Sequence, residues 1–99
     1  EALLRTPQFF PQAIANMTWV LATKQLKHTV LLGALSQQIA ATAPDFNPQN
    51  ISNTLWAFAT LAYSDEGALR ALARVAARKV PDFPRQELVN STWAIGRLN

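Results

Sequence analysis

The chain repeats its own sequence with a period of 37 residues. The segments FFPQAIANMTWVLA, FNPQNISNTLWAFA and FPRQELVNSTWAIG begin at Phe9, Phe46 and Phe83 and align without a gap. Self-similarity at a fixed period is the sequence signature of repeat architectures, in which each period forms one structural unit. Within these segments, the columns that keep one residue type in all three copies are Phe9/Phe46/Phe83, Gln12/Gln49/Gln86, Asn16/Asn53/Asn90 and Trp19/Trp56/Trp93.

The first half of each repeat has the apolar spacing of a helix. In the middle copy, Ile51, Leu55 and Phe58 are separated by four and three residues, which places them on one side of an α-helix. Pro48 suits the first helical position, where a missing N–H costs no hydrogen bond, and Asn47 suits the N-cap. We therefore predict a helix that begins at Pro48 and at the matching positions of the other copies.

A second helix follows within the same repeat. The segment 64–66 interrupts the first helix and supplies another N-cap with an acidic first turn. Leu69 and Leu72 then continue a helical pattern to about Lys79, and Pro81 prevents its continuation. Each repeat is thus predicted to be a helix-turn-helix hairpin.

One hairpin of this size cannot bury its own apolar surface, so such hairpins stack on copies of themselves. We predict an all-α fold, an α-solenoid of 37-residue repeats, of which the chain holds about 2.7. Neither end carries a polar capping repeat, so we expect a fragment of a longer array, with neighbouring repeats of the same longer chain as its partners. The predicted boundaries are residues 1–8 for the end of a second helix, 9–45 and 46–82 for two repeats, and 83–99 for the first helix of a further repeat.

Composition excludes several classes of protein. Hydrophobic residues make up 49% and charged residues 15%, unlike a disordered tail, and the absence of Cys excludes disulfide scaffolds and thiolate metal sites. No stretch approaches the roughly 18 uninterrupted apolar residues of a membrane span. Because His28 is the only His and Asp45 and Asp82 are explained by helix capping or turn formation, we predict no catalysis, no metal and no cofactor.

The repeated aromatic and aliphatic residues are expected to form the core between helices. Phe46, Ile51, Trp56 and Ala59 fall within an apolar arc that covers nearly half of the first helix. The repeated Trp has an alternative role, since indole rings also stack on nucleic-acid bases. We favour core packing for the Trp column.

With Trp56 counted in the apolar arc, the outward direction of the first helix runs through Asn50, Asn53, Thr54 and Ala57. Two columns on that side change from copy to copy. Amide, carboxylate and hydroxyl side chains bond the edges of unstacked bases, and helical RNA-binding repeats read about one base each in this way. Unconstrained drift of exposed positions is the alternative. The predicted base-reading residues are Ala13, Met17, Asn50, Thr54, Glu87 and Ser91.

The constant Gln and Asn columns lie one helical turn apart, so stacking places them in rows along the array. We favour a ladder of amides that satisfies backbone groups of the neighbouring repeat, because buried polar groups must be paired. Contact with the backbone of a ligand is the alternative. The residues are Gln12, Asn16, Gln49, Asn53, Gln86 and Asn90.

Basic residues are the candidates for phosphate contacts. The net charge of +3 permits a polyanionic partner without requiring one. Arg70, Arg74 and Arg78 form a row on the second helix of the middle repeat, either a solvated outer face or a set of phosphate contacts. Lys24 and Lys27 near the first turn are further candidates.

The strings PQAIANMTWVLA and FNPQNISNTLWAFATLA resemble the octotricopeptide repeats, with their Pro-Gln, Asn and Trp-Ala signature followed by a Leu-rich second helix. The resemblance covers essentially the whole chain. It departs from the family in two respects: the period of 37 matches the related heptatricopeptide repeats, and Arg85 replaces the Pro of the Pro-Gln pair in the third copy.

The resemblance implies an α-solenoid that binds RNA and governs gene expression in chloroplasts or mitochondria. We therefore expect sequence-selective binding of single-stranded RNA by an organellar factor for RNA stability, processing or translation. The alternative is a protein-interaction scaffold, such as a peripheral subunit of an organellar ribosome or another large assembly.

Overall fold

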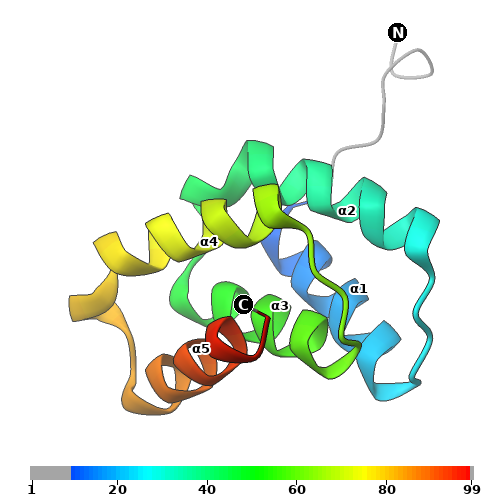
Figure 1. Cartoon of the computed structure of the whole chain (residues 1–99). Helices are drawn as coiled ribbons and strands as arrows, with labels where there is room; N and C mark the ends of the chain where they lie inside the picture. Colours follow the sequence, from blue (N-terminus) through cyan, green and yellow to red (C-terminus); the bar gives the residue numbers. More distant parts are fainter. Residues whose placement is uncertain (1–9, 99) are drawn as a thin grey trace, which may run out of the picture.

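The computed structural model describes residues 10–98, which form five α-helices and no strand (Figure 1). The all-α prediction is confirmed. Phe9 and the segment 1–8, predicted as the end of a second helix, lie outside the described residues, as does residue 99. The helices are α1 (Pro11–Thr23), α2 (Thr29–Thr42), α3 (Pro48–Thr60), α4 (Glu66–Arg78) and α5 (Arg85–Leu98), with short 3-10 turns at Ala43–Asp45 and Val80–Asp82.

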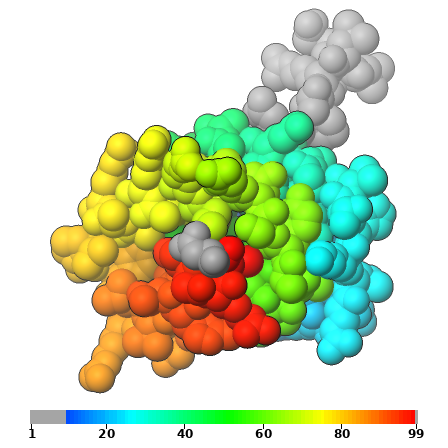
Figure 2. Space-filling model, viewed as in Figure 1, coloured from blue at the N-terminus to red at the C-terminus, as the bar shows by residue number. Residues whose placement is uncertain are grey.

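The helices are arranged in two layers. Helix α3 packs between α1 and α5 in one layer, and α2 packs against α4 in the other. The space-filling view shows α5 running beside α4 along one face of the molecule (Figure 2). A shallow hollow between these two helices is lined by Leu69 of α4 and Ile95 of α5. As a result, α3 leaves only one side for solvent, whereas α1 and α5 also leave an outer flank.

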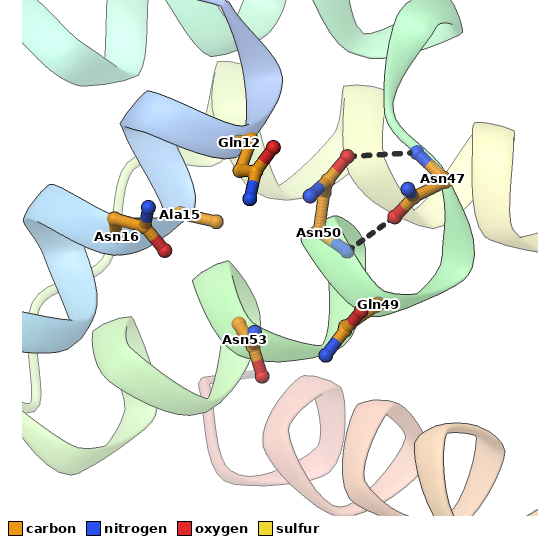
Figure 3. A pocket seen from close by; sticks show the side chains of 7 residues that line it. All are labelled: Gln12, Ala15, Asn16, Asn47, Gln49, Asn50 and Asn53. Atoms are coloured by element: carbon orange, nitrogen blue, oxygen red, sulfur yellow. Dashed lines mark hydrogen bonds between the residues drawn. The ribbon is translucent and has the colours of Figure 1, made fainter.

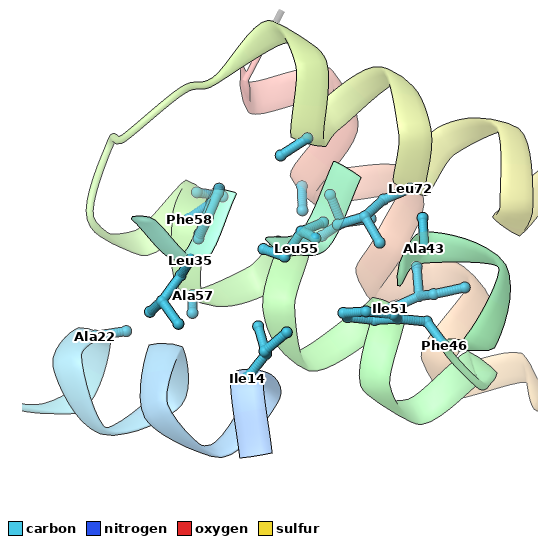
Figure 4. Packing of buried hydrophobic residues seen from close by; sticks show 14 of the residues in the cluster. Ile14, Ala22, Leu35, Ala43, Phe46, Ile51, Leu55, Ala57, Phe58 and Leu72 are labelled. Atoms are coloured by element: carbon cyan, nitrogen blue, oxygen red, sulfur yellow. The ribbon is translucent and has the colours of Figure 1, made fainter. Parts of the chain in front are cut away.

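The core fills the space between the two layers. Each of the first four helices contributes a fully buried aliphatic side chain: Ile14, Leu35, Leu55 and Leu72 (Figure 4). Burial of one such side chain contributes about 1.5–3 kcal/mol of stability. Phe46 lies before α3 and is also fully buried, as predicted.

The helix boundaries follow the repeat. Helices α1, α3 and α5 begin at residues 11, 48 and 85, and α2 and α4 begin at 29 and 66, all at the 37-residue spacing. Asn47 is the N-cap of α3 with Pro48 at its first position, and Asp65 is the N-cap of α4, both as predicted. Asp45 and Asp82 lie in the 3-10 turns, which confirms their role in turn formation.

The Trp column does not form the core that the sequence analysis favoured. Trp19 and Trp93 are 48% and 49% exposed, and Trp56 is only partly buried against the cluster. Each indole lies at the solvent edge of its helix. Helix α3 packs against neighbours on both flanks, whereas α1 and α5 have a neighbour in this layer on one flank only.

The predicted outward direction of the first helices is also wrong. Thr54 and Ala57 are fully buried and Asn50 is nine-tenths buried, because these residues form the flank of α3 that faces α1. Ser91 is buried in the same way on α5. Small side chains are needed at these positions, since two helices approach each other closely there.

Candidate functional site

The solvent-exposed side of α3 carries Gln49, Asn53 and Trp56. Their spacing of four and three residues places them on one strip of the helix. The equivalent strips of α1 and α5 lie on either side, because α3 packs between those two helices. We call the combined surface the amide–tryptophan face; its residues are Gln12, Asn16, Trp19, Gln49, Asn53, Trp56, Gln86, Asn90 and Trp93.

The six amides of this face do not form the predicted ladder between repeats. Within residues 10–98, the one hydrogen bond that they make runs inside α5, where Gln86 Nε2 donates to Asn90 Oδ1 at 3.2 Å. Gln12, Gln49 and Gln86 are exposed, so their polar groups are turned to solvent. Their donors and acceptors are therefore free to bind a ligand, which was the alternative role.

A polar pocket of about 170 Å³ lies between α1 and α3 (Figure 3). None of the described residues that line it is charged. Six of its seven lining residues are carboxamides, which carry both hydrogen-bond donors and acceptors. An uncharged group with donors and acceptors of its own suits such a pocket better than a phosphate does. The lining residues are Gln12, Ala15, Asn16, Asn47, Gln49, Asn50 and Asn53.

A capping box holds one wall of this pocket. Asn47 Oδ1 accepts from the Asn50 backbone N–H at 2.7 Å, and Asn50 Oδ1 accepts from the Asn47 backbone N–H at 3.2 Å. Two backbone donors at the start of α3 are thereby satisfied. The arrangement also fixes the orientation of the Asn50 amide.

The indole of Trp93 carries a cation above its ring. The guanidinium carbon of Arg97 lies 5.6 Å from the ring centroid, within the range of a cation–π contact. Arg97 therefore brings a positive charge next to the exposed Trp at the α5 end of the amide–tryptophan face.

The predicted base-reading residues are divided by the structure. Thr54 and Ser91 are buried between helices, and their hydroxyl oxygens have no hydrogen-bond partner within the described residues. Ala13, Met17 and Glu87 are partly exposed. A fully buried side chain cannot touch a base, so base reading by Thr54 and Ser91 is incompatible with this structure.

Most of the predicted phosphate contacts lie elsewhere. Arg70 pairs with Glu66, and Arg74 and Arg78 line a hollow between α2 and α4. All three Arg residues therefore belong to the other layer of helices and not to the amide–tryptophan face.

The two Lys candidates lie near the end of α1. Lys27 Nζ donates to the Ala62 carbonyl oxygen at 3.0 Å and so links the turns that follow α1 and α3. Lys24 is exposed, and its side chain makes no hydrogen bond to the described residues. Lys24 is thus the Lys that stays available for a phosphate.

Neither a cluster of metal ligands nor a membrane-spanning helix occurs among the described residues. Residues 10–98 contain no group of three or more His, Asp or Glu side chains placed to hold a metal ion. None of the five helices is long and apolar enough to cross a membrane.

Comparison with known proteins identifies no relative: no protein-family model, no curated protein and no solved structure matches the chain.

The sequence analysis missed the pocket, although a signal for it was present. Asn47 and Asn50 have the N-cap and N3 spacing of a capping box, with Gln49 between them and Asn53 one turn further on. Four amides within one helical start, facing an equivalent helix with Gln12 and Asn16, predict an uncharged polar site between the two helices.

Proposed function

We propose that the chain is a segment of an α-solenoid that binds single-stranded RNA along its amide–tryptophan face. The observation that carries the proposal is the coincidence of repetition and exposure. Gln, Asn and Trp recur on three adjacent helices at positions that solvent reaches, where packing does not dictate residue type. A ligand that repeats along its own length, such as a single strand, is a consistent reason for that recurrence.

The chemistry of the face suits single-stranded nucleic acid. Indole rings stack on unpaired bases irrespective of their identity, at about 1–3 kcal/mol per base. Amides donate to and accept from base edges and sugar hydroxyls. Arg97 and Lys24 supply positive charge near Trp93 and at the end of α1. In this form of the proposal the constant columns make the contacts, in place of Thr54 and Ser91.

Two features support the solenoid arrangement. The contact of α1 with α3 recurs between α3 and α5, and α2 contacts α4 in the other layer. In addition, Val20 and Val89 are exposed, although their equivalents Ala57 and Ser52 on α3 are buried by neighbouring helices. The outer flanks of α1 and α5 thus have the composition of surfaces on which a further hairpin stacks. The resemblance to octotricopeptide repeats is the basis for proposing an organellar factor.

Intrinsic fluorescence tests RNA binding directly, because all three Trp residues of the chain lie on the proposed face. Titration with a single-stranded RNA oligonucleotide should quench the emission, and the same sequence annealed to its complement should not. Replacing Val30, which is 78% exposed on α2 in the other layer, by Ala provides a surface control. Equal responses to both RNA forms, or no quenching, would overturn the proposal; quenching by a partner protein alone would favour the scaffold function.

A further inference from the structure

Among the residues that line the polar pocket between α1 and α3, Asn50 is the one that is nine-tenths buried and polar. Its Oδ1 is occupied, because it accepts from the Asn47 backbone N–H. The Nδ2 group must then point the other way, and Figure 3 shows it turned toward Gln12 across the pocket. Nδ2 donates to none of residues 10–98. The pocket therefore holds an oriented hydrogen-bond donor that has no protein acceptor.

We propose that this pocket binds the edge of one unpaired pyrimidine, and that Asn50 Nδ2 selects a carbonyl oxygen at ring position 4, so that uracil is preferred to cytosine. The inference rests on the RNA binding proposed above. Uracil and cytosine have nearly the same shape, but position 4 carries an acceptor in uracil and an amino donor in cytosine. A fixed donor at Asn50 bonds the first and is left facing another donor by the second.

The other lining residues suit this role. Gln12, Gln49 and Asn53 are not held by hydrogen bonds within the described residues, so they can rotate to match the remaining donors and acceptors of either base. The absence of charge in the pocket disfavours a phosphate. The capping box fixes the orientation of two pocket amides, Asn47 and Asn50, and of these only Asn50 is buried, so selection is assigned to Asn50.

The repeat supplies a comparison within the chain. Glu87 occupies the position of Asn50 on α5, and Ala13 occupies it on α1. A carboxylate is an acceptor only. The column 13/50/87 therefore changes hydrogen-bond character from one helix to the next, while the Gln and Asn columns beside it stay constant.

The Asn50→Asp variant tests the inference with the smallest structural change. A carboxylate oxygen still accepts from the Asn47 backbone N–H, so the capping box is kept, but the group facing the pocket changes from donor to acceptor. The affinities of hexauridylate and hexacytidylate are measured by NMR titration of the ¹⁵N-labelled chain, which also records the Asn50 side-chain amide. The natural chain should bind hexauridylate about fivefold more tightly, the size of one hydrogen bond. Asn50→Asp should reverse that preference.

The exposed Gln37 on α2 provides the matched control, because Gln37→Glu makes the same charge change in the other layer and should leave the preference at about fivefold. Binding of both oligonucleotides to the amide–tryptophan face without a preference, or the same preference in natural and Asn50→Asp chains, would overturn the inference and leave RNA binding intact. If neither oligonucleotide shifts any resonance of that face, RNA binding itself is overturned, and the inference with it.

Discussion

Gln25 and Ala62, which stand 37 residues apart, both adopt the left-handed backbone conformation, with φ of 57° and 53°. Each follows the end of a helix in the α1/α3/α5 layer, where two backbone hydrogen bonds close the turn. After α3, the Ala62 N–H donates to the Ala59 carbonyl oxygen, and the Tyr63 N–H donates to the Phe58 carbonyl oxygen. This is a Schellman motif, whose left-handed position is usually glycine. The two equivalent turns thus share the left-handed backbone conformation, although neither Gln nor Ala favours it.

Ala62→Gly should therefore stabilise the protein. A left-handed conformation costs an L-residue about 1–2 kcal/mol, of which the greater freedom of glycine in the unfolded chain cancels about half. We expect a gain of about 0.5–1 kcal/mol in the free energy of unfolding, measured by urea denaturation. Ala34→Gly at an exposed position within α2 is the control and should lower stability by about 1 kcal/mol. A loss of stability in Ala62→Gly would contradict the left-handed assignment.

Thr54→Val should also stabilise the fold, or leave it unchanged. The Thr54 hydroxyl is fully buried without a hydrogen-bond partner within the described residues. Replacing it with a methyl group of similar shape therefore removes a buried polar group without breaking a hydrogen bond. The expected gain is about 1 kcal/mol. Thr18 is the matched control, because it is equally buried but its Oγ1 donates to the Ala15 carbonyl oxygen at 3.0 Å. Thermal unfolding that ranks Thr18→Val above Thr54→Val would show that the Thr54 hydroxyl is bonded.

Lys79→Met should destabilise the protein by about 1–2 kcal/mol. Lys79 Nζ donates to the carbonyl oxygens of Pro44 and Phe46, at 3.1 and 2.7 Å, and so fastens the end of α4 to the loop before α3. Lys24→Met removes the same charge from an exposed residue without such bonds and should change stability little. Chemical denaturation of the two variants side by side measures the difference, and equal effects would mean that the Lys79 contacts contribute nothing.

Much of the fold follows from the sequence because the signals for it are local. Pro48 fixes the start of a helix, Asn47 and Asp65 cap two helices, and the 37-residue period carries these boundaries from one copy to the next. Such features depend on a few neighbouring residues, so they can be predicted without knowledge of the packing.

The side of the helix that faces solvent could not be inferred in the same way. Counting Trp56 as core turned the expected outward direction by roughly 80–100°, using ~100° per residue. The small residues Thr54 and Ala57 were then placed in solvent, although both form a close helix–helix contact. Hydropathy assigns a large apolar residue to the core even when it lies at the exposed edge of a helix, and it does not assign small residues to the core even when they lie in a helix–helix contact. Only the packing of α1 on α3 shows which of these residues are buried.

Asn50 shows the same limit in the candidate site. Its variation among copies was correctly noticed and its bond to Asn47 is local, but its burial depends on the start of α3 lying beside α1. The sequence therefore indicated the residue without the pocket that it lines.

Two adjacent residues of α3 provide the most direct test that the constant, exposed columns bind RNA. Asn53 faces solvent at the pocket, whereas Thr54 is buried against α1. The dissociation constant of a single-stranded RNA oligonucleotide, measured by fluorescence anisotropy at one fixed salt concentration, should rise about threefold to tenfold in Asn53→Ala, the loss of one or two hydrogen bonds. Thr54→Val should leave it unchanged. Weaker RNA binding by Thr54→Val, with unchanged binding by Asn53→Ala, would contradict the assignment. Base contact would then be assigned to the variable column that contains Thr54.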